Sequence, residues 1–298
     1  MSASNAASTP PQPEADFKHV DETDFLSMSR PEQIRHLEVE GYVVFPRILT
    51  PEIVTKVKSE MADAEMAHTS YSTQQLRSVR QPQWVSRTVA ELIGYPPLMD
   101  FLIDLMGPDI VFNRGFYQRS LSGCPGISMH TDGQPHGSNL FGFEGSCPRL
   151  IRVLYYLDDL SEQRAPFRLI PRSHISFHAE ASPYVRYTSH PEEITLIVPA
   201  GSAVLVPSML FHGSHPNLDE RPRELLQMGY RPAWAGPIQP IEDWDPALVE
   251  AAPEIAKPYL QSLNTTGQAF EQEHKPAGMK ADAPGMNPSR WENVRHGS

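Results

Sequence analysis

The segment Ser202-Ala-Val-Leu-Val-Pro-Ser-Met-Leu-Phe-His212 is an apolar strand pair that ends in a histidine. Short β-type runs of the same kind lie on both sides of it, at residues 110–112, 152–157, 167–170, 194–198 and 225–230. Proline, glycine, asparagine or aspartate punctuates most of these runs, which is typical of a sandwich or a barrel.

The first third of the chain has helical patterns instead. Ser29-Arg-Pro-Glu32 is a capping box that opens a helix ending near Glu40. Thr50 followed by proline starts a second helix. We expect a third helix near Val89–Met106 and one more near Pro246–Leu263.

This order of elements predicts an α+β fold with a mainly β core. The expected core is a double-stranded β-helix, of the jelly-roll or cupin-like type, with flanking N-terminal helices. We predict a single domain over residues 17–264, with the β-helix at about 108–235. Residues 1–16 and 265–298 are expected to form tails.

Composition narrows the classes of partner. A net charge of −11, from 25 basic and 36 acidic residues, argues against nucleic acid or an anionic membrane surface. No apolar run approaches the ~20 residues of a membrane span, and Met1 to Pro13 does not resemble a secretory signal. With two cysteines, a cytoplasmic location is the default expectation, and a Cys124–Cys147 bridge stays open. Oligomeric state is not indicated.

The stretch Gly126-Ile-Ser-Met-His130-Thr-Asp132 contains a candidate metal site. Residues two apart on a strand point to the same side. A histidine and a carboxylate in this relation supply two ligands of a 2-His-1-carboxylate site for Fe(II). The pattern alone decides nothing, because four similar pairs occur: His19–Asp21, His36–Glu38, His178–Glu180 and His190–Glu192.

The third ligand is expected from His212 or His215. His212 is favoured because it lies directly at a strand end, whereas His215 lies within a Pro/Asn turn. Arg223 follows eleven residues after His212, and a planar guanidinium suits the distal carboxylate of 2-oxoglutarate. The hydroxyl of Ser214 could donate to the same carboxylate. The alternative for Arg223 is a surface arginine in a proline-rich turn.

Residues 212–223, His-Gly-Ser-His-Pro-Asn-Leu-Asp-Glu-Arg-Pro-Arg, resemble the distal motif of the phytanoyl-CoA dioxygenase family. There, a His-Gly-Ser is followed eleven residues on by the arginine that binds 2-oxoglutarate. Gly41-Tyr-Val-Val-Phe and Tyr156-Leu-Asp-Asp159, with Leu169-Ile-Pro-Arg-Ser-His174, resemble other stretches of that family. The resemblance covers roughly residues 34–234 in the right order.

The resemblance implies a dioxygenase that uses Fe(II), 2-oxoglutarate and O2 and releases succinate and CO2. It places iron on His130, Asp132 and His212. An aspartate at position 132, in place of glycine or alanine, resembles the members that hydroxylate rather than halogenate. The implied substrate is a small molecule with an aliphatic C–H bond. Thr131, Ala165-Pro166 and Arg172 depart from the family pattern, and the substrate pocket remains unassigned.

Further contacts are predicted from the strand before His130. If Asn113, Gly115, Tyr117 and Arg119 share one face, Tyr117 could hydrogen-bond 2-oxoglutarate; the alternative is a packed barrel tyrosine. Residues 133–149 are read as a lid or an ordinary surface loop.

Three arginines, Arg77, Arg80 and Arg87, face either an anionic substrate or solvent. Two other functions stay open: a non-catalytic β-helix binding protein, and a Zn(II) hydrolase that uses the same three ligands. Neither of these functions requires Arg223.

Overall fold

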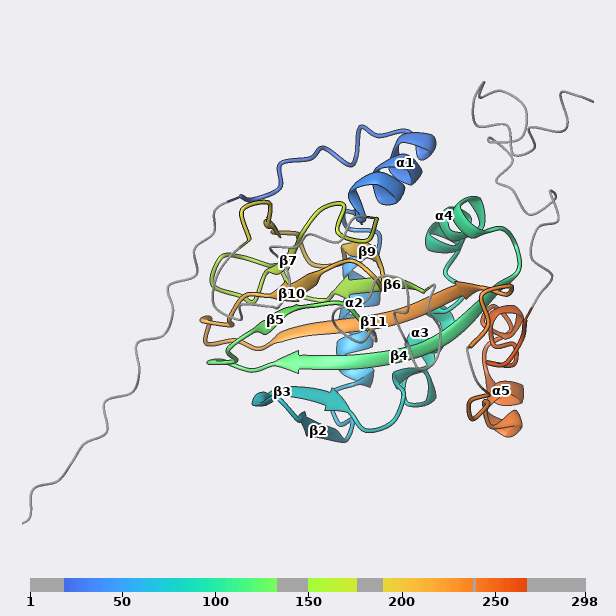
Figure 1. Ribbon diagram of the computed structural model, residues 1–298. Helices are drawn as coiled ribbons and strands as arrows, with labels where there is room; N and C mark the ends of the chain where they lie inside the picture. Colours follow the sequence, from blue (N-terminus) through green and yellow to red (C-terminus); the bar gives the residue numbers. More distant parts are fainter. Residues whose placement is uncertain (1–18, 133–149, 176–189, 238–239, 267–298) are drawn as a thin grey trace, which may run out of the picture.

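The computed structural model describes residues 19–132, 150–175, 190–237 and 240–266, which contain two antiparallel sheets (Figure 1). The larger sheet has the order β1-β9-β6-β11-β4-β3-β2, and the smaller has the order β5-β10-β7-β8. This arrangement confirms the predicted jelly-roll core.

The strands of the larger sheet are β1 (Val43–Phe45), β9 (Ala203–Pro207), β6 (Ile151–Tyr156), β11 (Arg223–Pro232), β4 (Ile110–Ser120), β3 (Ser72–Ser78) and β2 (Met66–Thr69). Those of the smaller sheet are β5 (Ile127–His130), β10 (His212–Ser214), β7 (Phe167–Leu169) and β8 (Ile194–Leu196). The predicted tails lie almost wholly outside the described residues, and the domain boundaries stay a prediction.

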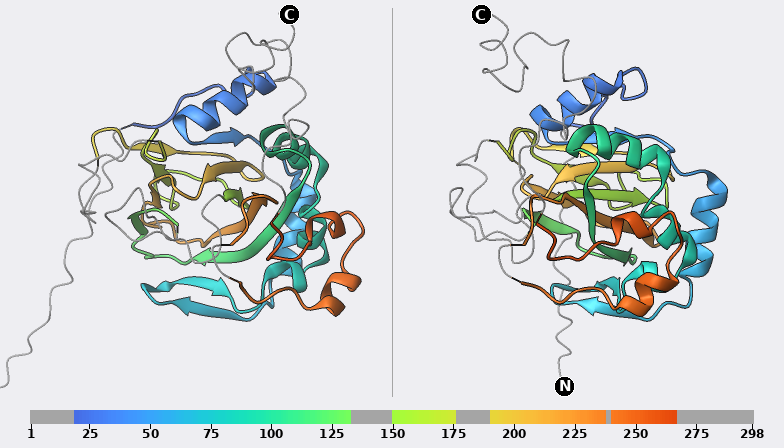
Figure 2. Two further views of the ribbon diagram at one scale, coloured as in Figure 1. Left: turned by 45° about the vertical axis from the view of Figure 1, so that its right-hand side comes forward. Right: turned by 90° about the vertical axis from the view of Figure 1, so that its right-hand side faces the viewer.

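Helices α2, α3 and α4 lie over the outer face of the larger sheet, and α1 lies at its edge beside β1 (Figure 2). The helical elements are α1 (Arg30–Glu40), α2 (Pro51–Glu60), η1 (Pro82–Trp84), α3 (Arg87–Leu92), α4 (Pro96–Met106), α5 (Pro246–Ala251) and η3 (Lys257–Tyr259). The capping box of α1 is present, and its helix ends at Gly41 in the left-handed conformation. Across the described residues, every helix is too short or too polar to cross a membrane.

Two helix predictions were wrong in extent. The helix expected over 89–106 is divided into α3 and α4, because the residue before a proline avoids helical backbone and Tyr95 precedes Pro96. Gly94 lies at the break, where a Cβ would come within 1.9 Å of the carbonyl oxygen of Ile255. The helix expected over 246–263 is confined to α5, followed by the short η3 turn.

The hairpin of β2 and β3 was not predicted. Its second strand reads Ser-Thr-Gln-Gln-Leu-Arg-Ser, which lacks the apolar alternation of a half-buried strand. It extends the larger sheet by pairing with β4, with Gln75 opposite Ser120.

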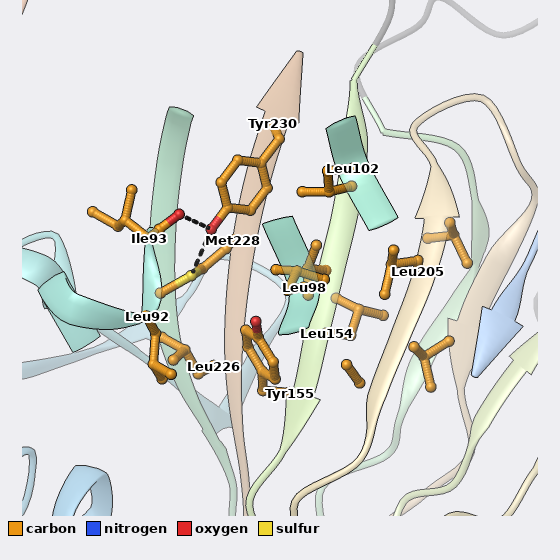
Figure 3. Packing of buried hydrophobic residues seen from close by; sticks show 14 of the residues in the cluster. Leu92, Ile93, Leu98, Leu102, Leu154, Tyr155, Leu205, Leu226, Met228 and Tyr230 are labelled. Atoms are coloured by element: carbon orange, nitrogen blue, oxygen red, sulfur yellow. Dashed lines mark hydrogen bonds between the residues drawn. The ribbon is translucent and has the colours of Figure 1, made fainter. Parts of the chain in front are cut away.

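Apolar side chains fill the space between the outer face of the larger sheet and helices α3 and α4 (Figure 3). The hydroxyl of Tyr230 donates to the carbonyl of Ile93 at 3.1 Å, so this buried polar group is paired. The core residues seen here are Leu92, Ile93, Leu98, Leu102, Tyr155, Leu226, Met228 and Tyr230. This packing directs the other face of the larger sheet toward the smaller sheet.

Candidate metal centre and anion site

A cavity lies between the two sheets. Three strands of the larger sheet line it with every second residue: Arg114, Phe116 and Gln118 of β4, Arg152, Leu154 and Tyr156 of β6, and Arg223, Leu225 and Gln227 of β11. The smaller sheet lines it with Ile127, His130, Phe167, His212, Gly213 and Ser214. Asp132 also borders the cavity. The cavity therefore brings together five of the six site residues predicted from the sequence, all except Tyr117.

His130 and His212 face each other across the antiparallel strands β5 and β10. Their ring centroids are 4.5 Å apart. Asp132 follows β5, and its backbone N–H donates to the carbonyl of Ser208 at 2.9 Å. This bond ties the carboxylate to the turn that precedes His212.

The donor atoms of these three side chains form one group. Nε2 of His130 is 3.9 Å from Oδ1 of Asp132, and Nε2 of His212 is 3.9 Å from Oδ2. Within the described residues, no other trio of His, Cys, Asp or Glu offers donor atoms this close together. The competing His-x-Asp and His-x-Glu pairs in that part of the chain are therefore not metal groups.

Backbone carbonyls set the orientation of both imidazoles. Nδ1 of His130 is 2.8 Å from the carbonyl oxygen of Ser128, and Nδ1 of His212 is 2.9 Å from that of Leu210. A carbonyl can only accept, so each Nδ1 carries the proton and each Nε2 presents a lone pair to the centre. Burial and the neighbouring His212 lower the pKa of His130 to about 4, so this ring is neutral at pH 7.

Gly213 allows the two ligand strands to approach each other. A Cβ at this position would lie 2.5 Å from the carbonyl oxygen of Ile127 on β5. No side chain fits at that distance, so the His-Gly-Ser motif has a steric reason for its glycine.

Arg152 was not predicted, although it contacts the metal group directly. Its Nε donates to Oδ2 of Asp132 at 2.7 Å, and its side chain is 4% exposed. Burial alone would raise the pKa of Asp132, but the guanidinium beside it holds that pKa well below its usual range. A lone arginine at the start of an apolar strand is the sequence signal that points to such a partner.

Arg223 borders the cavity and is not a surface arginine. It is 2% exposed, and its guanidinium carbon is 5.7 Å from the ring centroid of Tyr156. Its buried Nε and Nη1 have no hydrogen-bond partner, and no carboxylate of the described chain forms an ion pair with it. Because an uncompensated buried charge is costly, this cation requires an anion from outside the described residues.

Ser214 lies two residues after His212 and also borders the cavity. Its hydroxyl oxygen accepts a hydrogen bond from the backbone N–H of Ile127 at 3.1 Å. The hydroxyl hydrogen remains available to donate, so its contact with 2-oxoglutarate stays a prediction.

The predicted contact of Tyr117 with 2-oxoglutarate was wrong. Tyr117 is fully buried on the outer face of β4, where its ring centroid is 5.5 Å from the guanidinium carbon of Arg119. Phe116 and Gln118 border the cavity instead. Both faces of β4 are largely buried, so alternation along the strand did not reveal which face is inner.

His215, His174 and Cys124 lie outside the metal group and do not border the cavity. His215 is buried outside the metal group, with Nε2 hydrogen-bonded to Oγ1 of Thr195 at 3.0 Å. His174 is a turn residue whose Nε2 donates to the carbonyl of Glu38. Cys124 is a buried free cysteine, and Cys147 lies outside the described residues. The whole segment 133–149, expected to be a lid or an ordinary surface loop, also lies outside them.

The three arginines do not act together. Arg77 borders the cavity, with its guanidinium carbon 4.4 Å from the ring centroid of Phe116. Arg80 is exposed, and Arg87 pairs with Glu91 on α3. Arg80 and Arg87 therefore face solvent, as the alternative interpretation predicted.

Known proteins share this fold. The chain superposes with a TM-score of 0.59 on the solved structure of HygX from Streptomyces hygroscopicus with nickel and 2-oxoglutarate bound. It superposes with a TM-score of 0.56 on the carbocyclase SnoK from nogalamycin biosynthesis. The identities are 19% and 16%, each over 74% of this chain and over 94% and 96% of theirs. At these identities the likeness shows the fold alone.

Sequence comparison extends the likeness to a family. Dioxygenase trt7 from Aspergillus terreus is 22% identical over 235 residues, covering 74% of this chain and 80% of its own. The sequence pattern of the phytanoyl-CoA dioxygenase (PhyH) family matches residues 37–225, which contain the metal group and Arg223. The chain belongs to the phytanoyl-CoA dioxygenase family.

Proposed function

We propose that this protein is an Fe(II)- and 2-oxoglutarate-dependent dioxygenase that hydroxylates an aliphatic C–H bond of a small organic substrate. One observation carries the proposal: a 2-His-1-carboxylate group borders the same cavity as a buried arginine that has no carboxylate partner among the described residues. A metal site alone also fits a hydrolase, but a hydrolase does not require a buried arginine such as Arg223 beside the metal site.

The three donors suit Fe(II). His130, Asp132 and His212 would hold the ion through two neutral nitrogens and one carboxylate oxygen, which is the ligand set of non-heme iron oxygenases. The carbonyls of Ser128 and Leu210 fix both imidazoles in the tautomer that coordinates through Nε2. Arg152 holds Oδ2 of Asp132 and restrains the orientation of the carboxylate.

Arg223 fits the distal carboxylate of 2-oxoglutarate. A planar guanidinium presents parallel N–H pairs, Nε with Nη2 or Nη1 with Nη2, that match a carboxylate in two hydrogen bonds. Each of these pairs in Arg223 includes a nitrogen, Nε or Nη1, that has no hydrogen-bond partner among the described residues. Ser214 lies between this arginine and the metal ligands along the chain and would add a hydroxyl donor. The bound dianion would supply the negative charge that the described part of the chain does not place beside Arg223.

Iron with 2-oxoglutarate and O2 supplies an oxidant that removes hydrogen from an unactivated C–H bond, with succinate and CO2 as co-products. The protein holds the substrate next to this centre and excludes water through apolar walls that include Leu154, Phe167 and Leu225. Asp132 fills the carboxylate position, which supports hydroxylation over halogenation.

Related folds support a small-molecule substrate. HygX has been crystallised with hygromycin B, and SnoN, described as an epimerase, in complex with nogalamycin RO. SnoN is described as an epimerase and SnoK as a carbocyclase on the same fold, so the fold alone does not decide the reaction.

The test is an assay of succinate formed from 2-oxoglutarate with Fe(II), ascorbate and O2, with calorimetry of 2-oxoglutarate binding under anaerobic conditions. We expect slow uncoupled succinate formation and a saturable binding isotherm. Replacement of Fe(II) by Zn(II) should abolish succinate formation while 2-oxoglutarate still binds. Absence of both turnover and binding with Fe(II) would contradict the proposal and favour a hydrolase or a non-catalytic binding protein.

A further inference from the structure

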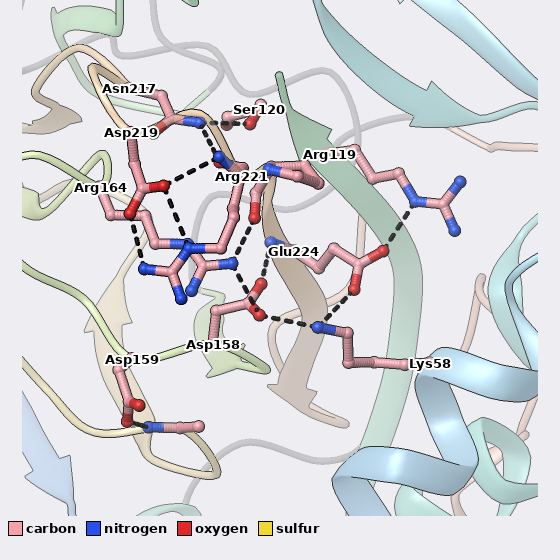
Figure 4. Close-up of polar contacts among 12 residues, drawn as sticks. Lys58, Arg119, Ser120, Asp158, Asp159, Arg164, Asn217, Asp219, Arg221 and Glu224 are labelled. Atoms are coloured by element: carbon pink, nitrogen blue, oxygen red, sulfur yellow. Dashed lines mark hydrogen bonds and ion pairs between the residues drawn. The ribbon is translucent and has the colours of Figure 1, made fainter. Parts of the chain in front are cut away.

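Asp158 and Arg164 form a buried ion pair behind the start of β11, the strand that carries Arg223 (Figure 4). Nη2 of Arg164 is 3.0 Å from Oδ1 of Asp158, and the two residues are 8% and 7% exposed. Neither borders the cavity. Buried pairs of this kind seldom add net stability over apolar residues, which raises the question of what this pair does.

Both members of the pair bind the backbone on either side of Arg223. Nη2 of Arg164 donates to the carbonyl oxygen of Pro222 at 2.6 Å. Oδ2 of Asp158 accepts from the backbone N–H of Glu224 at 2.7 Å. The peptide groups before and after Arg223 are therefore fixed by two side chains that are also bound to each other.

A third side chain holds the approach to this point. Nδ2 of Asn217 donates to the carbonyl of Ser120 at 2.8 Å and to that of Arg221 at 3.0 Å. Ser120 is the residue opposite Arg223 in the β4–β11 pairing. The turn that leads into β11 is thus tied to the neighbouring strand before Arg223 is reached.

This arrangement controls where the guanidinium lies. The two fixed peptide groups restrain the backbone angles of Arg223 and so the direction of its Cα–Cβ bond. A long side chain converts a small rotation at Cα into a large displacement of its tip, and misplacement by ~1 Å is enough to cost up to about 100-fold in a positioned interaction.

We propose that Asp158 and Arg164 are positioning residues that aim Arg223 at the distal carboxylate of 2-oxoglutarate. The proposal rests on the function proposed above. It gives the ion pair a role in cosubstrate affinity, although neither residue touches the cosubstrate.

The test compares two ligands on Ni(II)-loaded protein, which cannot turn over. One is 2-oxoglutarate and the other is 2-oxopentanoate, which has the same chain length but no distal carboxylate. For Asp158→Asn and Arg164→Met we expect the Kd for 2-oxoglutarate to rise roughly 10-fold or more. The Kd for 2-oxopentanoate should change less than about twofold, because that ligand does not use Arg223.

Arg119→Met is the matched control. Lys58 lies 2.7 Å from Oδ1 of Asp158 and 2.8 Å from Oε2 of Glu224, and Arg119 donates to Oε1 of Glu224 at 2.8 Å, so Arg119 belongs to the same ionic network. The backbone atoms that its side chain binds belong to Met61 and Ala62, not to the residues next to Arg223. Arg119→Met should leave both Kd values unchanged. Arg164→Lys, which keeps a cationic donor, should restore much of the affinity for 2-oxoglutarate, and it serves as the readout if Arg164→Met does not fold.

The outcomes separate the two proposals. Equal weakening of both ligands in Asp158→Asn would mean general loosening of the site and would overturn the positioning role. Unchanged 2-oxoglutarate affinity in folded variants would overturn it as well. Failure of the unsubstituted protein to bind 2-oxoglutarate would instead overturn the proposed function, and the positioning role with it.

Discussion

Arg152 donates from Nε to Oδ2 of Asp132 at 2.7 Å, so a buried cation of the larger sheet holds a carboxylate that follows the smaller sheet. This contact joins the two sheets at the metal group. It also leaves Oδ1 on the side of His130, at 3.9 Å from Nε2.

We expect Arg152→Gln to weaken binding of a divalent metal by about 10- to 100-fold, because the carboxylate loses the partner that orients it. The measurement is an anaerobic titration with Fe(II), or with Co(II) followed by its absorption spectrum. Arg77→Gln, at another cavity arginine that contacts Phe116 rather than Asp132, is the control. Equal losses in the two variants would contradict a specific role for Arg152.

Arg223→Met should abolish 2-oxoglutarate binding without loss of stability. Removal of a buried charge that has no carboxylate partner among the described residues removes a desolvation cost, so the unliganded variant should unfold at the same temperature or higher. In the unsubstituted protein, 2-oxoglutarate at 100 times its Kd should stabilise the fold by about 2.7 kcal/mol. Thermal unfolding with and without the ligand measures both effects, and a variant that retains the ligand-induced stabilisation would exclude Arg223 as the clamp.

His212→Ala should abolish binding of Ni(II), whereas His215→Ala should retain it. Of these two histidines, only His212 presents Nε2 to the group that contains His130 and Asp132. His215 instead pairs with Thr195, so its loss should lower stability by about 1–3 kcal/mol. Calorimetric Ni(II) titration of both variants decides the assignment, and the reverse result would make His215 the ligand.

Gly213→Ala should separate the two ligand strands. Its Cβ would lie 2.5 Å from the carbonyl oxygen of Ile127, and relief of that contact should cost about 1–3 kcal/mol and weaken metal binding. Gly123→Ala is the control: it meets no atom within 4 Å and carries only the strain of a positive φ, about 1–2 kcal/mol. Urea unfolding and metal titration of the pair test this, and intact metal affinity in Gly213→Ala would contradict it.

Stability should fall between pH 6.5 and 4 in part because of His215. Burial and then Arg168 lower the pKa of His215 from 6.5 to about 4. The unfolded chain therefore binds a proton in this window that the folded chain does not, so stability is lost as pH falls, by ~3 kcal/mol over the whole window. In His215→Gln, urea unfolding at pH 7 and pH 4.5 should show a smaller difference than in the unsubstituted protein; an equal difference would assign the effect to other groups.

Much of the fold was readable from the sequence because its signals are local. The capping box at Ser29, the apolar runs of the core strands and their punctuation each depend on neighbours within a few residues. The polar strand β3 and the break before Pro96 were missed. The first is held by pairing with β4, a contact distant in the chain. The second has a local cause, since Tyr95 precedes a proline, and Gly94 at the break lies close to the carbonyl oxygen of Ile255.

The residues of the candidate site could be predicted from the sequence where a ligand set requires a particular spacing of residue types. His130, Asp132, His212 and Arg223 were predicted from a strand period of two, a strand-end histidine and a cation at a characteristic distance. The prediction for Tyr117 was wrong because both faces of its strand are largely buried. In such a strand, the pattern of apolar residues does not show which face points into the cavity.

By itself, the sequence determined most of the core strands, the class of core and the residue types needed for a metal and an anion. Only the tertiary structure decided that Arg152 meets Asp132, that Arg223 has no carboxylate partner within the described chain, and that Asp158 and Arg164 hold the backbone beside it. The physical reason is range: helix caps and strand alternation are set by near neighbours, whereas pairing of buried charges depends on strands far apart in the chain.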